Sequence, residues 1–206
     1  VRTNWKRGDR GNGRCGCPLF RQSRDLDFEQ IDPYEPVLFG TMEQHPSRFL
    51  VENISFLSRG RALDIAMGGG RNAVYLASKG FEVEGVDISR KAVKEAMSLA
   101  GKHGVKIHAK VADLEKAYAI PADAYDLIIC FNYLQRSLFS AIKAGVKSGG
   151  MVVYETFIVD QAMFGKPKNP EHLLKHNELL HLFIDFRILR YHEGIMGPNR
   201  TVAGVI

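Results

Sequence analysis

The chain carries Asp64-Ile65-Ala66-Met67-Gly68-Gly69-Gly70-Arg71-Asn72, and this stretch decides its fold. The stretch joins a short apolar segment at 61–66, typical of a strand, to a helical pattern at 71–79. Glycine has no Cβ, so the backbone can turn sharply here and approach a bound molecule closely. The following helix would present unpaired N–H groups and the positive end of its dipole. The stretch therefore predicts a ligand-binding loop between a strand and a helix.

Strand and helix patterns alternate on both sides of this loop. Further segments typical of strands are 82–86, 105–111, 125–131, 151–157, 186–192 and 201–206. Segments typical of helices are 46–57, 89–103, 135–147 and 171–184. Such alternation favours parallel strands joined by helical crossovers. We therefore expect an α/β protein with a doubly wound, mostly parallel sheet.

Basic side chains are concentrated near the N-terminus. Residues 1–24 contain seven Arg or Lys and one acid, whereas the whole chain of 206 residues has 28 basic and 23 acidic residues. The remainder therefore has 21 basic and 22 acidic residues and is nearly neutral, which argues against a broad nucleic-acid surface. We expect a flexible basic arm at 1–30 and one domain at 31–206.

Composition also indicates where the protein resides. No apolar run approaches the roughly 20 residues that a membrane helix needs, and the first residues lack the order of a secretory signal. A cytoplasmic protein without membrane contact is the expectation. Cys15, Cys17 and Cys130 do not have the four-ligand spacing of a structural zinc site, so no metal is expected.

Three acids lie at or just after the ends of consecutive strand patterns, where open α/β sheets bind ligands. Asp87, nineteen residues after Gly68, is placed to bind ribose hydroxyls, and Asp113 is placed to contact an adenine edge. Asp64 precedes the glycines, where a carboxylate attracts an ammonium group but repels a pyrophosphate. The set favours a methionine-linked nucleoside over a nicotinamide cofactor, although the loop also fits G-x-G-x-x-A.

These motifs resemble those of the class I S-adenosylmethionine-dependent methyltransferases over residues 43–206. D-x-A-x-G-x-G at 64–70 is similar to the first motif, with Ala66 in place of the usual first glycine. The later motifs are matched by V-E-G-V-D-I-S at 83–89, V-A-D-L at 111–114, D-L-I-I at 126–129 and K-S-G-G at 147–150. G-R-N-A at 70–73, with Y-L-A at 75–77, is similar to the tellurite-resistance-type branch.

The resemblance implies a seven-stranded sheet whose last strand is antiparallel, and S-adenosylmethionine as the cofactor. The residues expected to bind it are Asp64, Ala66, Gly68, Gly70, Asn72, Asp87, Ile88, Asp113, Leu114 and Phe131. The implied reaction transfers the methyl group of S-adenosylmethionine to a small-molecule acceptor.

A methyl group on a sulfonium is already activated, so its in-line displacement chiefly needs alignment of the reactants. A strong base is needed only when the acceptor must lose a proton. We therefore expect a thiol, a selenium or tellurium anion, or another heteroatom as the acceptor. Asn132, Arg136 and Glu155 are the candidates on its side. Arg136 would neutralise an anion, or is an exposed helix cation; Glu155 would act as a base or hydrogen-bond acceptor, or is paired with a neighbour.

Two other functions fit the same residues. The basic side chains at 1–24 are suited to phosphate contacts in an RNA-modifying methyltransferase. The domain would also serve as a sensor or partner subunit that binds S-adenosylmethionine without catalysis. The sequence leaves the acceptor and the oligomeric state open.

Overall fold

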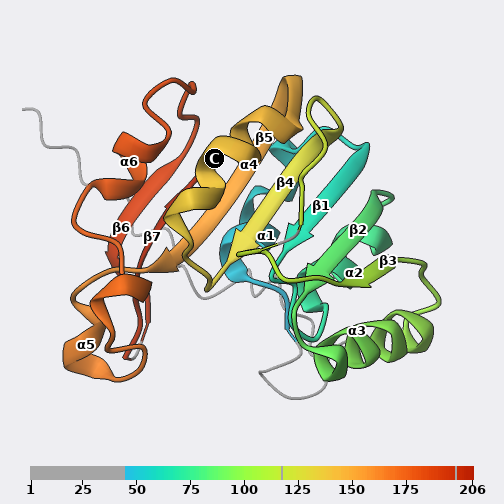
Figure 1. Ribbon diagram of the computed structural model, residues 1–206, viewed down its shortest axis with the longest axis horizontal. Coiled ribbons are helices and arrows are strands. Elements are labelled where there is room, and N and C mark those ends of the chain that lie inside the picture. The colour runs from blue at the N-terminus through green and yellow to red at the C-terminus, as the bar shows by residue number, and fades with distance from the viewer. Residues whose placement is uncertain (1–44, 117, 198) are drawn as a thin grey trace, which may run out of the picture. The chain divides into compact units, whose positions relative to one another are not determined.

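A computed structural model describes residues 45–116, 118–197 and 199–206 of the chain (Figure 1). These residues belong to a compact unit at 39–206. The expected arm at 1–30, and the first part of the expected domain at 31–206, lie outside the described residues. Within the described ranges, no helix is long and apolar enough to cross a membrane.

Seven described strands form one sheet in the order β3-β2-β1-β4-β5-β7-β6. They are β1 (Arg61–Ile65), β2 (Glu82–Asp87), β3 (His108–Val111), β4 (Tyr125–Phe131), β5 (Val146–Phe157), β6 (Tyr191–Ile195) and β7 (Thr201–Val205). The pairs among β1 to β5 are parallel, whereas β7 is antiparallel to both β5 and β6. The predicted doubly wound sheet with an antiparallel last strand is confirmed. Its order reverses at β1, which lies between β2 and β4, and ligands bind at such a switch point.

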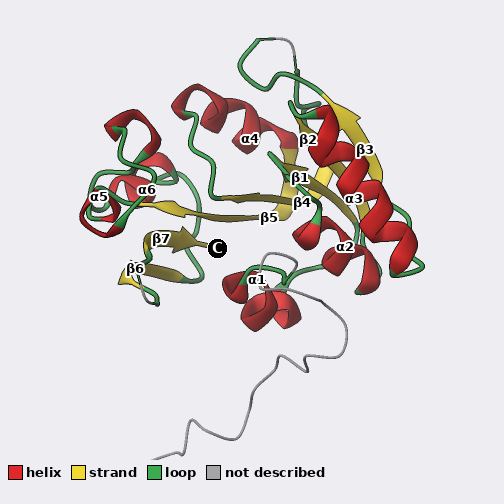
Figure 2. Cartoon of the chain, turned by 90° about the horizontal axis from the view of Figure 1, so that it is seen from below, coloured by secondary structure: helices red, strands yellow, loops and turns green. Residues whose placement is uncertain are grey.

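Helices cover both faces of the sheet (Figure 2). They are α1 (Arg48–Asn53), α2 (Arg71–Ser78), α3 (Arg90–Lys102), α4 (Phe139–Gly145), α5 (Gln161–Phe164) and α6 (Glu178–Leu182), with 3-10 turns η2 (Ile54–Phe56), η3 (Arg136–Leu138) and η4 (Pro170–His172). Leu127 and Ile129 of β4 pack with α1, α2 and α3, whereas Ile128 and Cys130 pack with α4 and α6. Alternate strand residues face opposite sides, so a strand covered on both faces is apolar throughout.

The helix expected at 135–147 ends earlier than the sequence predicted. It stops at Gly145, because the carbonyls of Ala144 and Gly145 accept the N–H groups of Asp123 and Ala124. A Cβ at Gly145 would lie 2.5 Å from Ile120 Cγ2, so glycine allows this close approach. Residues 146–150 begin β5 instead of ending the helix.

The helix expected at 171–184 is also wrong as a continuous element. Residues 170–172 form η4, Leu174 then bridges to Ile158, and α6 begins only at Glu178. Asn177 has φ +61°, which interrupts a right-handed helix. The long-range pairing of Leu174 thus overrides the local helical pattern.

Two expected strands are displaced. The strand expected at 105–111 covers only 108–111, because the Val105 N–H closes back onto the Ala100 carbonyl at the end of α3. The strand expected at 186–192 instead runs from Tyr191 to Ile195.

Candidate active site

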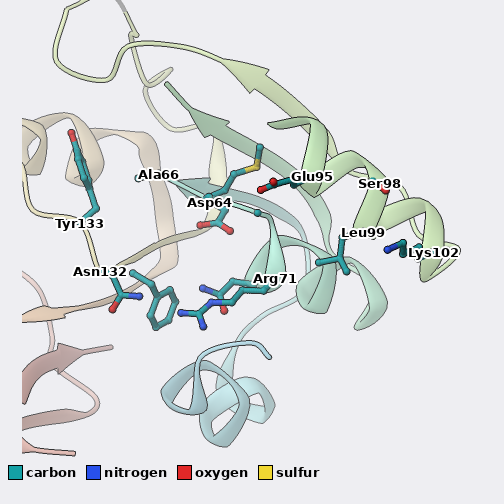
Figure 3. A pocket seen from close by; sticks show the side chains of 14 residues that line it. Asp64, Ala66, Arg71, Glu95, Ser98, Leu99, Lys102, Asn132 and Tyr133 are labelled. Carbon is teal, nitrogen blue, oxygen red and sulfur yellow. The ribbon is translucent and has the colours of Figure 1, made fainter. Parts of the chain in front are cut away.

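A cleft of about 670 Å³ lies at the carboxyl ends of β1 and β4 (Figure 3). The loop after β1 forms one wall, the residues after β4 form another, and one side of α3 extends the cleft outward. Its lining residues are Asp64, Ala66, Met67, Gly68, Gly69, Arg71, Asn72, Glu95, Ser98, Leu99, Lys102, Phe131, Asn132 and Tyr133. The cleft therefore occupies the switch point of the sheet, next to the loop that the sequence singled out.

Left-handed backbone shapes the loop. Ala66, Gly68 and Gly70 have φ values of +52°, +55° and +79°. A Cβ on Gly70 would lie 2.5 Å from Ala96 Cβ in α3, whereas a Cβ on Gly68 would have nothing within 4 Å. Gly70 thus permits close packing of the loop on α3, and Gly68 leaves open space where a ligand can approach the backbone.

Asp64 is a buried carboxyl that points into the cleft (Figure 3). Asp64 is only 2% exposed, and its Oδ2 has no hydrogen-bond partner among the described residues. Burial raises the pKa of Asp64 to about 8, against the lowering effects of Arg71 and of the Ala73 N–H. A buried carboxyl oxygen without a hydrogen-bond partner is suited to receive a cationic group of a ligand.

Asp87 connects the loop to the end of β2 through hydrogen bonds. Its Oδ2 accepts the Gly68 N–H at 2.9 Å, and its Oδ1 accepts the Ser89 N–H at 2.8 Å. Each carboxylate oxygen keeps a second lone pair for a ligand hydroxyl. Asp113 accepts the Glu115 N–H at 3.0 Å in the turn that follows β3.

Five of the ten residues predicted to bind the cofactor line the cleft, and the other five do not. The predicted binding residues that line the cleft are Asp64, Ala66, Gly68, Asn72 and Phe131. Those that do not line it are Gly70, Asp87, Ile88, Asp113 and Leu114. Among these, Ile88 is exposed and Leu114 is buried. Of the acceptor-side candidates, Asn132 lines the cleft, and Arg136 and Glu155 do not.

Glu155 and Asn132 belong to a polar cluster that also contains two residues missed from the sequence. Arg200 Nη2 donates to Glu155 Oε1 at 2.8 Å and to Asn132 Oδ1 at 2.9 Å. His192 Nε2 lies 3.3 Å from Glu155 Oε2. Burial raises the pKa of Glu155, but His192 and Arg200 lower it more, so the net pKa lies below its usual value. Glu155 is therefore an ionised and paired carboxylate at neutral pH.

Gly204 makes room for the His192 ring in this cluster. A Cβ at Gly204 would lie 2.4 Å from His192 Cε1, and β7 pairs Gly204 with both Glu155 and His192. A glycine inside a strand indicates a close approach, so Gly204 is the signal in the sequence from which this position could have been found. It does not reveal which side chain approaches.

Arg136 forms hydrogen bonds with η4 and with the residues that follow it. Its Nε and Nη2 donate to the two carboxylate oxygens of Glu178 at 2.6 and 2.9 Å. Its Nη1 and Nη2 also donate to the carbonyls of Glu171 and Leu173 at 2.9 Å each. This geometry favours a role in holding residues 171–178 in place over direct contact with an acceptor.

We expect Arg136→Ala to lower the free energy of unfolding by about 1–2 kcal/mol, because Glu178 and two carbonyls lose their donor in a partly exposed setting. Urea denaturation would measure the change, with Lys91→Ala as the control. Lys91 forms only an exposed ion pair with Glu95, so this control should change stability by less than about 0.5 kcal/mol. Equal effects of the two substitutions would contradict the structural role of Arg136.

Comparison with known proteins agrees with this fold. Residues 62–150 match the family model of a methyltransferase domain. A ubiquinone biosynthesis O-methyltransferase from Chromobacterium violaceum is 26% identical over 138 residues, which are 65% of this chain and 56% of that protein. The enzyme of the same name from Bordetella avium is 32% identical over 101 residues, which are 47% and 42% of the two chains. The chain thus matches about half the length of these relatives.

A solved structure has the same fold. TehB from Haemophilus influenzae superposes with a TM-score of 0.65 and 21% identity, over 76% of this chain and 60% of that one. The match at 62–150 and the shared fold agree with the expected class I S-adenosylmethionine-dependent methyltransferase. The expected sheet is confirmed. A solved S-adenosylmethionine-dependent methyltransferase from Aquifex aeolicus shares the fold with a TM-score of 0.57 and 18% identity, over 76% of this chain and 86% of that one.

Proposed function

We propose that the protein transfers the methyl group of S-adenosylmethionine to a small-molecule acceptor. The observation that carries this proposal is the buried, unpaired Asp64 oxygen beneath the glycine loop, in the same cleft as Asn132. A cationic amino-acid group would compensate that carboxylate, whereas a pyrophosphate would be repelled. The names of the two relatives, both referring to ubiquinone biosynthesis, support a small-molecule acceptor.

The described residues fit S-adenosylmethionine, which supplies an electrophilic methyl group on a positively charged sulfur. Asp64 would bind the ammonium group, and the open space of the loop at Gly68 would accommodate the ligand. Asp87 would accept ribose hydroxyls through its second lone pairs. The remaining residues proposed to bind S-adenosylmethionine belong to the loop or would lie near the adenine. They are Ala66, Gly70, Asn72, Ile88, Asp113, Leu114 and Phe131.

The acceptor side is built for alignment more than for proton abstraction. Glu155 is ionised and held by Arg200 and His192, so it is a weak base. This supports an acceptor that needs no strong base, such as a thiol, a selenium or tellurium anion, or an aromatic heteroatom. Arg200, which donates to Asn132 and keeps a third of its side chain exposed, replaces Arg136 as the proposed cation near the acceptor.

Isothermal titration of the purified chain with S-adenosylmethionine, S-adenosylhomocysteine and NAD tests the proposed donor. We expect the first two to bind and NAD not to bind; binding of NAD alone would overturn the proposal. Formation of S-adenosylhomocysteine with a panel of thiols, chalcogen anions and phenols then tests catalysis. If no member of a broad panel supports turnover, a non-catalytic binding domain is favoured.

The RNA-modifying alternative is tested through the basic residues at 1–24. Their removal should abolish salt-dependent RNA affinity if the arm supplies phosphate contacts. Unchanged RNA affinity after the deletion removes this alternative.

A further inference from the structure

The residue before α1 connects the donor loop to the acceptor-side cluster. The Ser47 N–H donates to Asn72 Oδ1 at 2.7 Å, and Ser47 Oγ lies 3.5 Å from Glu155 Oε1 as a weak hydrogen bond. Ser47, Asn72 and Glu155 are all buried. A single residue thus contacts two groups that are 25 and 108 positions away in the sequence.

The same short helix reaches the cluster at a second point. The Phe49 ring packs edge-on against His192, with 4.5 Å between the ring centroids. Ser47 is the N-cap residue of α1, and its carbonyl accepts the Val51 N–H at 3.0 Å. Because Ser47 and Phe49 belong to one hydrogen-bonded turn, a displacement of Ser47 also moves the ring that packs on His192.

Asn72 is the contact on the donor side. It is the second residue of α2 and lines the cleft, so a molecule bound at the loop lies within its reach. Its amide oxygen already accepts the Ser47 N–H, whereas its amide nitrogen provides two further donors. A ligand that reorients this amide therefore changes the hydrogen bond that holds Ser47.

We infer that Ser47 is a positioning residue that couples donor binding at Asn72 to the Glu155–His192 pair. This inference rests on the proposed function, because it requires a donor in the cleft. Coupling between two sites is reciprocal, so a bound donor would strengthen acceptor binding, and a bound acceptor would strengthen donor binding by the same factor. The acceptor site is then completed only when the donor site is occupied.

The test follows the His192 ring by NMR during titration with S-adenosylhomocysteine, and the ring signal is identified by its loss in His192→Gln. Ser47→Ala removes only the hydroxyl, whereas Ser47→Pro also removes the N–H that binds Asn72. The φ of Ser47, −58°, is compatible with proline, and the proline ring would displace the Asn72 amide from its present position. Ser55→Ala is the matched control, since Ser55 is an exposed serine of the adjoining η2 turn.

We expect S-adenosylhomocysteine to shift the His192 signal in the wild type and in Ser55→Ala. In Ser47→Pro the shift should fall at least twofold, with a smaller loss in Ser47→Ala, while affinity for S-adenosylhomocysteine changes less than threefold. Equal His192 shifts in all variants, with normal binding, would overturn the coupling and leave the proposed function intact. Failure of the wild type to bind either S-adenosyl compound would overturn both. If Ser47→Pro does not fold, Ser47→Ala alone decides.

Discussion

Asp64→Asn is expected to weaken S-adenosylmethionine binding by about 30- to 100-fold while it makes the ligand-free protein more stable. The loss of affinity corresponds to about 2–3 kcal/mol, typical of a charge-assisted contact in a buried site. The gain in stability follows from the pKa of Asp64, which burial raises to about 8. Isothermal titration and thermal denaturation measure the two effects on the same preparation.

The sign of the stability effect depends on pH. The pKa of Asp64 is about 8 in the folded state, against an ordinary value of 3.8. The folded protein therefore loses stability as the pH rises from about 3.8 to about 8. Asparagine stays neutral, so the advantage of Asp64→Asn should grow between pH 5 and pH 8 and reach about 1–3 kcal/mol near pH 7. A variant that is less stable than the wild type throughout this range would contradict the assignment of Asp64 as an uncompensated carboxyl.

The affinity for S-adenosylmethionine should also depend on pH through the ionisation of Asp64. A cationic donor needs ionised Asp64, so the affinity of the wild type should rise with pH below about 8, by up to about tenfold per unit. This dependence should disappear in Asp64→Asn. Asp185→Asn is the matched control, because Asp185 is an exposed aspartate that does not line the cleft, and its substitution should alter neither affinity nor its pH dependence by more than about twofold.

The sequence predicted those parts of the site that are continuous in the chain. The loop at 64–72 joins β1 to α2, so its residues are neighbours in sequence and in space. Burial on both faces explains why β4 was recognised from its apolar residues alone. Asp64 and Asp87 could be placed because parallel strands end at the same edge of the sheet.

The acceptor side was not predictable in the same way. Arg200 lies 45 residues after Glu155, and Ser47 lies 108 residues before it. Their meeting depends on the antiparallel register of β7 and on the packing of α1, and neither leaves a local pattern in the sequence. The contacts of Arg136 could not be predicted for the same reason, since its partner Glu178 is 42 residues away.

Substitution of the loop glycines should also have a large effect, on the free energy of unfolding. Comparison of two of them separates the cost of steric contact from the cost of backbone strain. Gly70→Ala is expected to lower the free energy of unfolding by about 2–4 kcal/mol, and Gly68→Ala by about 1–2 kcal/mol. Both residues have positive φ, so both substitutions strain the backbone. Only at Gly70 would the new Cβ also meet the Cβ and Cα of Ala96, at 2.5 and 2.9 Å.

Urea denaturation of the ligand-free variants measures the difference, which should be about 1–2 kcal/mol if the loop packs on α3 as described. The Gly70→Ala, Ala96→Gly double variant should recover much of that difference, because removal of the Ala96 methyl group relieves the closest contact. Ala96→Gly alone costs about 1 kcal/mol in a helix and provides the reference for the cycle. Additive losses in the double variant would mean that the loop does not approach α3 at Ala96, and the cleft wall that the loop forms would have to be placed differently.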